Sequence, residues 1–131
     1  DIPAEHPLTA VVHAAGVLDD ATLRNLDADR LDAVLRPKAD GARHLDRLTR
    51  DTDLAAFVLF SSAAGLVGSA GQGAYAAANV HLDSLATARA RAGLPATSVA
   101  WGLWQSDSAM TGDLSATDRA RMTRGGLLPL T

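Results

Sequence analysis

The sequence predicts an α/β fold, as part of a doubly wound parallel sheet, and three observations support this prediction. Three short apolar runs have the composition of buried strands, and they occupy residues 8–13, 57–60 and 96–101. Two longer segments between these runs have helical character. Strands and helices therefore alternate along the chain, a pattern typical of parallel strands that are joined by right-handed crossovers.

The composition fits one modest domain or part of one. The chain has 131 residues, of which 47% are hydrophobic and 21% charged, and its net charge is −3. The arginines are scattered among acidic residues, so we expect neither nucleic acid nor an anionic membrane as partner. The lack of cysteine excludes disulfides and thiolate metal sites and suits a reducing cytoplasm. The four histidines form no cluster with metal-ligand spacing, and no apolar stretch approaches the ~20 residues that span a bilayer.

The first strand is predicted over residues 8–13 and runs into a turn of three small residues. These are Ala14, Ala15 and Gly16. Such a turn lets the backbone approach a ligand closely, although glycine turns are common. A leucine and two acidic residues follow in the loop, namely Leu18, Asp19 and Asp20. The two carboxylates either cap the next helix or belong to a site, and composition does not decide between these alternatives.

The first helical segment is predicted from Asp27 to about Arg50, where leucine, valine and alanine recur on one face. Pro37 lies inside this pattern, and a proline there kinks or restarts a helix. Lys38 is therefore expected near a fresh helical turn. From spacing alone, a lysine at such a position is either a solvated helix residue or part of a site.

The central strand, residues 57–60, ends in two serines, Ser61 and Ser62, at a carboxyl edge of the sheet. A glycine-rich loop follows, and then an alanine-rich segment that favours a helix. Tyr75 and Asn79 lie one turn apart on one face of that helix. Because ligands of open α/β sheets bind outside the carboxyl ends of the strands, these side chains predict a polar site.

The third strand follows a helix stop at residues 93–95, which contain a glycine and a proline. It is predicted over residues 96–101. The segment from Gly102 onward is polar or small, and only residues 115–124 favour a short helix there. Such a segment is typical of a lid or of a frayed end.

A phosphate-binding loop is not evident in the sequence. A dinucleotide-binding sheet needs a glycine-rich turn after its first strand, and none occurs before residue 13. Gly71, Gly73 and Ala76 have the spacing of that fingerprint, but Tyr75 already occupies the helix start. The acidic ribose partner expected ~20 residues later is also not evident.

Five strings in order resemble one family. They are residues 11–20 (VVHAAGVLDD), 35–38 (LRPK), 57–62 (FVLFSS), 71–79 (GQGAYAAAN) and 100–104 (AWGLW). The chain is similar to the carboxyl-terminal half of a ketoreductase domain of a modular (type I) polyketide synthase. These domains belong to the short-chain dehydrogenase/reductase superfamily, so the resemblance implies a Rossmann-like fold.

The resemblance implies a catalytic tetrad. Tyr75 matches the tyrosine that donates a proton to the substrate carbonyl oxygen, and Ser62 matches the serine that hydrogen-bonds the same oxygen. Lys38 matches the lysine that lowers the tyrosine pKa, and Asn79 the amide that completes the set. Simpler members of the superfamily place lysine four residues after the tyrosine, whereas polyketide ketoreductases exchange lysine and asparagine, as here. The chemistry agrees, because a free phenol has a pKa of ~10 and a nearby cation favours the phenolate.

The resemblance also implies cofactor and stereochemical residues. Residues that match the NADPH-lining segments are His13, Ala14, Ala15, Gly16, Trp101 and Gly102. Leu18, Asp19 and Asp20 match the motif of B-type ketoreductases, which form a D-configured (3R) β-hydroxyl, and Val67 stands where the opposite type has tryptophan. The two tryptophans, Trp101 and Trp104, could equally be core anchors. The segment of about 103–126 matches the lid over the substrate.

The substrate implied is a β-ketoacyl chain that phosphopantetheine tethers to an acyl carrier protein. We expect the N-terminal phosphate-binding half of the domain to lie outside residues 1–131, supplied by the parent protein or by a second chain, and the fragment alone to be inactive. One alternative is another short-chain dehydrogenase or epimerase, against which Asn79 argues. The other is a non-catalytic structural subdomain, against which Tyr75 and Lys38 argue.

Overall fold

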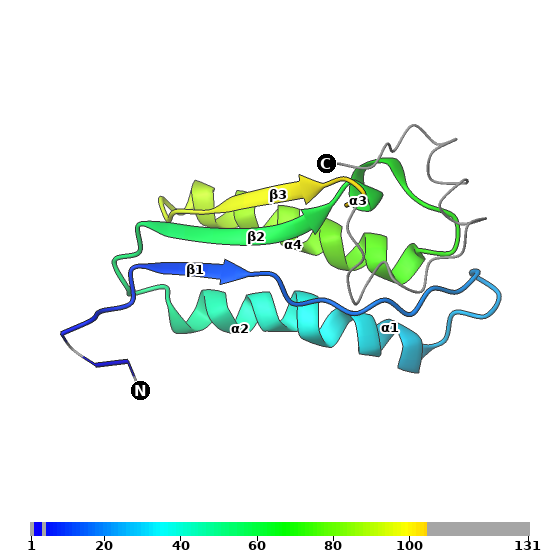
Figure 1. Cartoon of the computed structure of the whole chain (residues 1–131), viewed down its shortest axis with the longest axis horizontal. Helices are drawn as coiled ribbons and strands as arrows, with labels where there is room; N and C mark the ends of the chain where they lie inside the picture. The colour runs from blue at the N-terminus through cyan, green and yellow to red at the C-terminus, as the bar shows by residue number, and fades with distance from the viewer. Residues whose placement is uncertain (1, 4, 105–131) are drawn as a thin grey trace.

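A computed structural model of the chain describes residues 2–3 and 5–104, and its secondary structure alternates between strands and helices (Figure 1). Its elements, in order, are β1 (Ala10–His13), α1 (Ala28–Leu35), η1 (Arg36–Asp40), α2 (Gly41–Leu48), β2 (Ala56–Ser62), α3 (Ala64–Val67), α4 (Gly73–Arg91) and β3 (Thr97–Trp101). Three strands occur where the sequence predicts them. The central strand is longer than predicted, because it continues through both serines.

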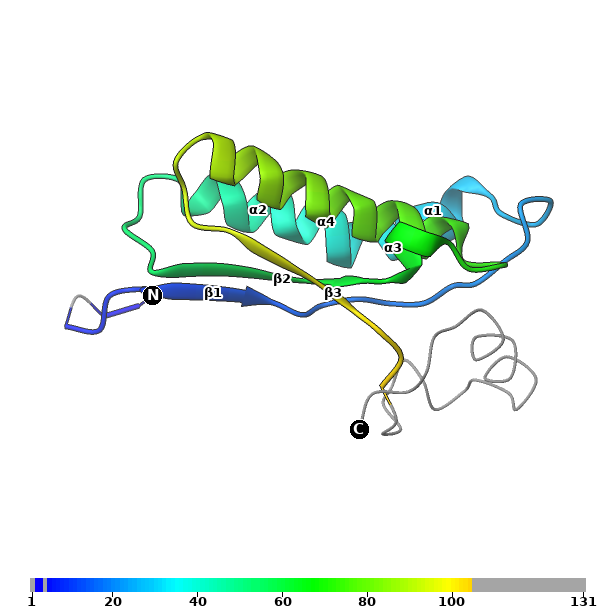
Figure 2. The same ribbon diagram turned by 90° about the horizontal axis from the view of Figure 1, so that it is seen from above.

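The strands form one parallel sheet in the order β1-β2-β3. Val12 pairs with Val58, and Phe60 pairs with Val99. Both helical connections advance across the sheet in the same direction, so crossovers of one hand bring them to the same face. Figure 2 shows α1, α2 and α4 together on that face. The predicted α/β fold with parallel strands is confirmed.

Burial in β2 alternates between buried and half-buried residues, which differs from the burial on both faces expected for this strand. Phe57 and Leu59 face the helices and are fully buried, and they pack with Leu82 and Ala86 of α4. Among the described residues, helices cover only this face of the sheet, which explains the alternation. The other face carries Val12, which is exposed.

The first helical segment is continuous where a break or kink was expected. Pro37 lies in η1, a π-helical turn between α1 and α2, so the helix widens by one residue and does not end there. A proline has no N–H to donate to the helix ladder, and a wider turn accommodates that loss. The turn buries Lys38, of which 3% is exposed, so this lysine is not a solvated surface residue.

The loop between β2 and α4 contains a short helix, α3, that the glycine-rich sequence did not predict. It ends at Gly68, whose φ of 73° lies in the left-handed region, and Gly71 has a φ of 84°. Side chains with a Cβ rarely adopt these angles, so these two glycines determine where the loop turns. The loop then leads into the first turn of α4.

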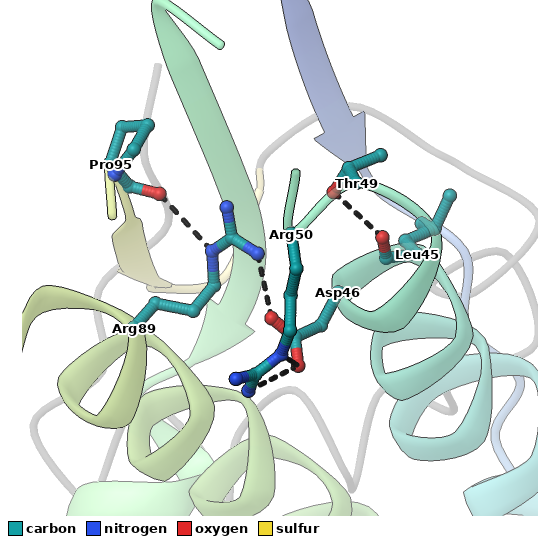
Figure 3. A network of polar contacts seen from close by, with 6 residues as sticks. All are labelled: Leu45, Asp46, Thr49, Arg50, Arg89 and Pro95. Carbon is teal, nitrogen blue, oxygen red and sulfur yellow. Dashed lines mark hydrogen bonds and ion pairs between the residues drawn. The ribbon is translucent and has the colours of Figure 1, made fainter. Parts of the chain in front are cut away.

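A buried ion pair connects α2 with α4 at the end of the helix layer that lies near residues 93–95 (Figure 3). Arg89 is 1% exposed and donates from Nη1 to Asp46 Oδ1 over 2.6 Å, while its Nε donates to the carbonyl oxygen of Pro95. Its guanidinium lies 3.9 Å from the centroid of the Phe57 ring. Arg50 reaches the other carboxylate oxygen of Asp46. The charges are therefore paired although they are buried.

Candidate active site

The predicted site residues converge on the edge where the parallel strands end. His13, Ser62 and Trp101 are the last residues of β1, β2 and β3. In Figure 1 all three arrows point to the same side, where the first turns of α4 also lie. Tyr75 is in that first turn. The arrangement is the one in which open α/β sheets bind ligands.

Lys38 and Tyr75 lie together although 37 positions separate them in the sequence. Lys38 Nζ is 5.4 Å from the centroid of the Tyr75 ring and donates a hydrogen bond of 2.9 Å to the carbonyl oxygen of Phe60. At this distance the ammonium group and the aromatic ring attract each other. The Tyr75 hydroxyl makes no hydrogen bond with any other residue of 2–3 and 5–104.

Burial lowers the pKa of Lys38 below the 10.5 of a free lysine, because the charged form loses solvation. Lys38 is also the only lysine of the chain, and Tyr75 is the only tyrosine. The Lys38 amine therefore releases its proton more readily than a free lysine does. Because it lies beside the Tyr75 ring, it is suited to pass a proton to the phenol.

The lowered pKa predicts how stability depends on pH. Between the lowered pKa and 10.5, the unfolded chain binds a proton that folded Lys38 has released, so the free energy of unfolding rises with pH in this window. Relative to Lys38→Met, the wild type should gain stability as the pH increases toward 10.5. Urea unfolding of both proteins from pH 7 to 10.5 measures this difference. A difference that is constant, or that changes in the opposite direction, would contradict it.

Asn79 is fully buried and holds the first turns of α4. Its Nδ2 donates to the carbonyl oxygen of Tyr75 over 2.8 Å, while its Oδ1 has no hydrogen-bond partner among the described residues. The side chain therefore contacts the backbone of Tyr75 and is closed to solvent. The structure thus brings Lys38, Tyr75 and Asn79 together, with Asn79 behind the tyrosine.

The two serines of β2 point in different directions. Ser61 is buried and donates to the carbonyl oxygen of Asn79 over 3.3 Å. Ser62 is half-buried, and its Oγ accepts a hydrogen bond from the N–H of Ala64 at the start of α3. Ser61 is therefore occupied inside the core, and Ser62 is the serine that can reach a ligand. The bond to Ala64 shows that Ser62 also caps the local turn.

The loop with Leu18, Asp19 and Asp20 is attached to the start of α4. Gln72 Nε2 donates to Asp20 Oδ2 over 2.9 Å, and the N–H of Ala21 donates to the carbonyl oxygen of Gly71 over 2.8 Å. Asp19 pairs with Arg30 of α1. Neither acidic residue caps α1, because Asp27 does so by accepting from the N–H of Arg30. Gln72 and Arg30 were not expected in the site, and their partners are too distant in sequence for any local signal.

The remaining predicted residues lie around this centre. Val67 is 69% exposed on α3. The ring of Trp101 lies between those of Phe60 and Trp104 in tilted contacts, with centroids at 5.4 and 4.8 Å, and its buried Nε1 has no hydrogen-bond partner in the described part of the chain. The two tryptophans contact each other, but Trp104 is 44% exposed and Trp101 half-buried, so neither is a fully buried core residue. His13 turns its ring toward the backbone of Lys38.

The edge also has features that fit a flat, polar cofactor. The turn after β1 carries only small residues, Ala14, Ala15 and Gly16, and its two alanines are exposed, so a ligand can approach the backbone. Across residues 2–3 and 5–104 no group of three His, Cys, Asp or Glu side chains could hold a metal ion.

Comparison with known proteins identifies the family. The sequence profile of the KR domain matches residues 1–106. The chain belongs to the ketoreductase (KR) domain family. It is 63% identical over 129 residues to polyketide synthase GfsB of Streptomyces halstedii, and 60% identical over 130 residues to mycoketide-CoA synthase of Mycobacterium tuberculosis. The alignments cover 98% and 99% of this chain. These matches confirm the predicted relationship to ketoreductase domains of modular polyketide synthases, which belong to the short-chain dehydrogenase/reductase superfamily.

Solved structures agree with the fold of this ketoreductase chain. A structure described as A-type ketoreductases from a modular polyketide synthase has a TM-score of 0.88 and 50% identity over 98% of the chain. The first ketoreductase of the tylosin synthase has a TM-score of 0.84 and 48% identity over 96% of the chain. The chain spans 26% and 27% of those structures, and 2% and 3% of the two synthases above. In the part of the chain described, no helix has the length and apolarity that a membrane crossing needs.

Proposed function

We propose that this ketoreductase chain carries the catalytic residues for NADPH-dependent reduction of a β-ketoacyl thioester to a β-hydroxyacyl thioester in polyketide biosynthesis. The observation that carries the proposal is the position of Lys38 Nζ, 5.4 Å from the Tyr75 ring centroid in a buried setting. A positive group at this place stabilises the negative charge that develops on the phenol oxygen while the proton is donated. Within residues 2–3 and 5–104 no hydrogen bond occupies the Tyr75 hydroxyl, and this supports its proposed role as the proton donor.

In this mechanism each residue has one task. NADPH, when bound, would supply the hydride, and the residues proposed to line its site are Ala14 to Gly16, Trp101 and Gly102. His13 begins this segment, but its buried ring is turned to the backbone of Lys38. Tyr75 donates its proton to the carbonyl oxygen, and Ser62 donates a hydrogen bond to the same oxygen, which stabilises the alkoxide as it forms. Lys38 then returns a proton to Tyr75. Asn79 keeps Tyr75 in place through its backbone oxygen.

The stereochemical part of the proposal is a B-type, D-configured (3R) hydroxyl. It depends on Leu18, Asp19 and Asp20, whose loop the Gln72–Asp20 hydrogen bond attaches to the start of α4, and on valine at position 67. Solved relatives include ketoreductases described as A-type and as C2-type. The fold is therefore common to several types, and the assignment depends on these residues alone.

The substrate proposed is tethered to an acyl carrier protein by phosphopantetheine, in the cytoplasm. We also propose that residues 1–131 are the C-terminal part of the catalytic subdomain, with a lid at about 103–126 that lies mostly outside the described residues. The phosphate-binding half comes from the remainder of the ketoreductase, in the same parent protein or a second chain.

The experiment is a measurement of NADPH oxidation by the full-length protein with a β-ketoacyl pantetheine thioester. We expect turnover with NADPH, dependence on thioester concentration, and a much lower rate with NADH. A folded protein that binds NADPH and shows no turnover would contradict the proposal and would favour the structural, non-catalytic alternative. Turnover with NADH alone would contradict the cofactor assignment.

A further inference from the structure

His13 contacts the backbone of Lys38. It is the last residue of β1, is 6% exposed, and its Nε2 lies 2.8 Å from the main-chain oxygen of Lys38. A carbonyl oxygen only accepts, so the Nε2 of His13 must carry the proton and donate it. Neither cofactor chemistry nor proton transfer uses this bond in the mechanism above.

The π-helical turn η1 provides the acceptor. The N–H of Gly41 donates to the oxygens of Arg36 and Lys38 at the end of this turn. The oxygen of Lys38 therefore accepts from Gly41 inside the helix and from His13 across to the sheet, and its two lone pairs suffice for both. Pro37, which has no N–H, lies in the same turn as the Lys38 oxygen that accepts from His13.

Gly41 leaves the space that the imidazole ring needs. A Cβ at position 41 would lie 3.2 Å from Cε1 of His13, a tight contact that would require the ring to shift by a few tenths of an ångström. The backbone of Gly41 is ordinary helix, with a φ of −55°, so its lack of a side chain is needed for packing and not for its conformation. His13, Lys38 and Gly41 thus form one close contact between sheet and helix.

We propose that His13 is a positioning residue that holds the backbone of Lys38 so that Nζ lies beside the Tyr75 ring. The side chain of Lys38 is held at its far end by the carbonyl oxygen of Phe60 in β2, and His13 fixes its near end to β1. Both ends of Lys38, its ammonium group and its backbone, are therefore hydrogen-bonded to strands of the sheet. The inference rests on the proposed function, because it assigns His13 an effect on catalysis through Lys38.

The test compares His13→Met, which removes the donor at similar volume, with His13→Gln, whose amide can still donate, in the full-length protein. We expect His13→Met to lower kcat by about 10- to 100-fold, as small misplacements of catalytic groups do, with the KM for NADPH within about twofold. The basic limb of the kcat–pH profile should also differ from that of the wild type, because Lys38 Nζ no longer lies at its place beside the Tyr75 ring. His13→Gln should restore most of kcat and most of the wild-type pH profile. His44→Met, at an exposed histidine of α2, should change neither.

Two results would overturn the inference. One is a His13→Met protein with wild-type kcat and pH profile, and the other is a raised KM for NADPH at unchanged kcat, which would make His13 a cofactor contact. If His13→Met loses its cooperative thermal transition, Gly41→Ala replaces it, because the added methyl group presses on Cε1 and shifts the ring by a few tenths of an ångström, while alanine favours the helix. The same loss of kcat is then expected, and wild-type kcat would overturn the inference. An inactive wild type would instead show that the proposed function itself fails.

Discussion

Replacing Tyr75 with phenylalanine is expected to lower kcat for NADPH-dependent reduction by a factor of about 10² to 10⁴, the usual contribution of a positioned general acid. The substitution removes only the hydroxyl, which no described residue binds, so the fold should remain. The ring stays beside Lys38 Nζ, and the cation–ring contact of 5.4 Å is preserved. The effect therefore isolates the proton that the phenol donates.

The measurement is single-turnover reduction of a β-ketoacyl thioester by the full-length Tyr75→Phe protein, with NADPH binding measured separately by fluorescence. We expect the Kd for NADPH to stay within about twofold of the wild type, since the substitution removes no cofactor contact. A Tyr75→Phe protein that reduces the thioester within threefold of the wild-type rate would show that another group supplies the proton.

Replacing Arg89 with methionine is expected to lower the free energy of unfolding of the intact ketoreductase domain by about 3–5 kcal/mol, because it leaves a buried carboxylate without its buried partner. Asp46 has a side-chain exposure of 7%, and Arg50, its other partner, is 53% exposed and compensates weakly (Figure 3). Arg89 also loses its contact with the Phe57 ring. Urea unfolding followed by circular dichroism measures the change.

Two controls separate the buried charge from a general effect of losing an arginine. Arg36→Met removes the exposed pair of Arg36 with Asp32 and should change stability by less than about 0.5 kcal/mol. Arg89→Met combined with Asp46→Leu removes both buried charges and should recover most of the loss. If Arg89→Met alone costs less than about 1 kcal/mol, the ion pair does not stabilise the contact between α2 and α4.

The fold was predictable where the signal is local. Each strand is a short apolar run bounded by proline, glycine or serine, and α4 follows from an alanine-rich segment, so these elements needed no tertiary information. The behaviour of Pro37 was not predictable, because a break and a π-helical turn both relieve the missing N–H, and only packing against the sheet selects between them. The burial of Lys38 follows from that choice.

The site was predictable in part for the same reason. Tyr75 and Asn79 are one helical turn apart, so their proximity follows from helix geometry alone. Lys38 was chosen through a family resemblance, because its 37-residue separation from Tyr75 carries no local signal. The bond from Gln72 to Asp20 spans 52 positions, and the bond from His13 to Lys38 spans 25, so both needed the folded structure.

Transfer of deuterium tests the central claim most directly. The full-length protein is mixed with NADPH that carries deuterium at the reactive position of the nicotinamide and with a β-ketoacyl pantetheine thioester, and the product is analysed by mass spectrometry and chiral chromatography. We predict one deuterium at the β-carbon of a D-configured (3R) hydroxyl. A hydroxyl product without deuterium would contradict direct hydride reduction at this site, and a deuterated L-configured hydroxyl would contradict the role of Leu18, Asp19 and Asp20.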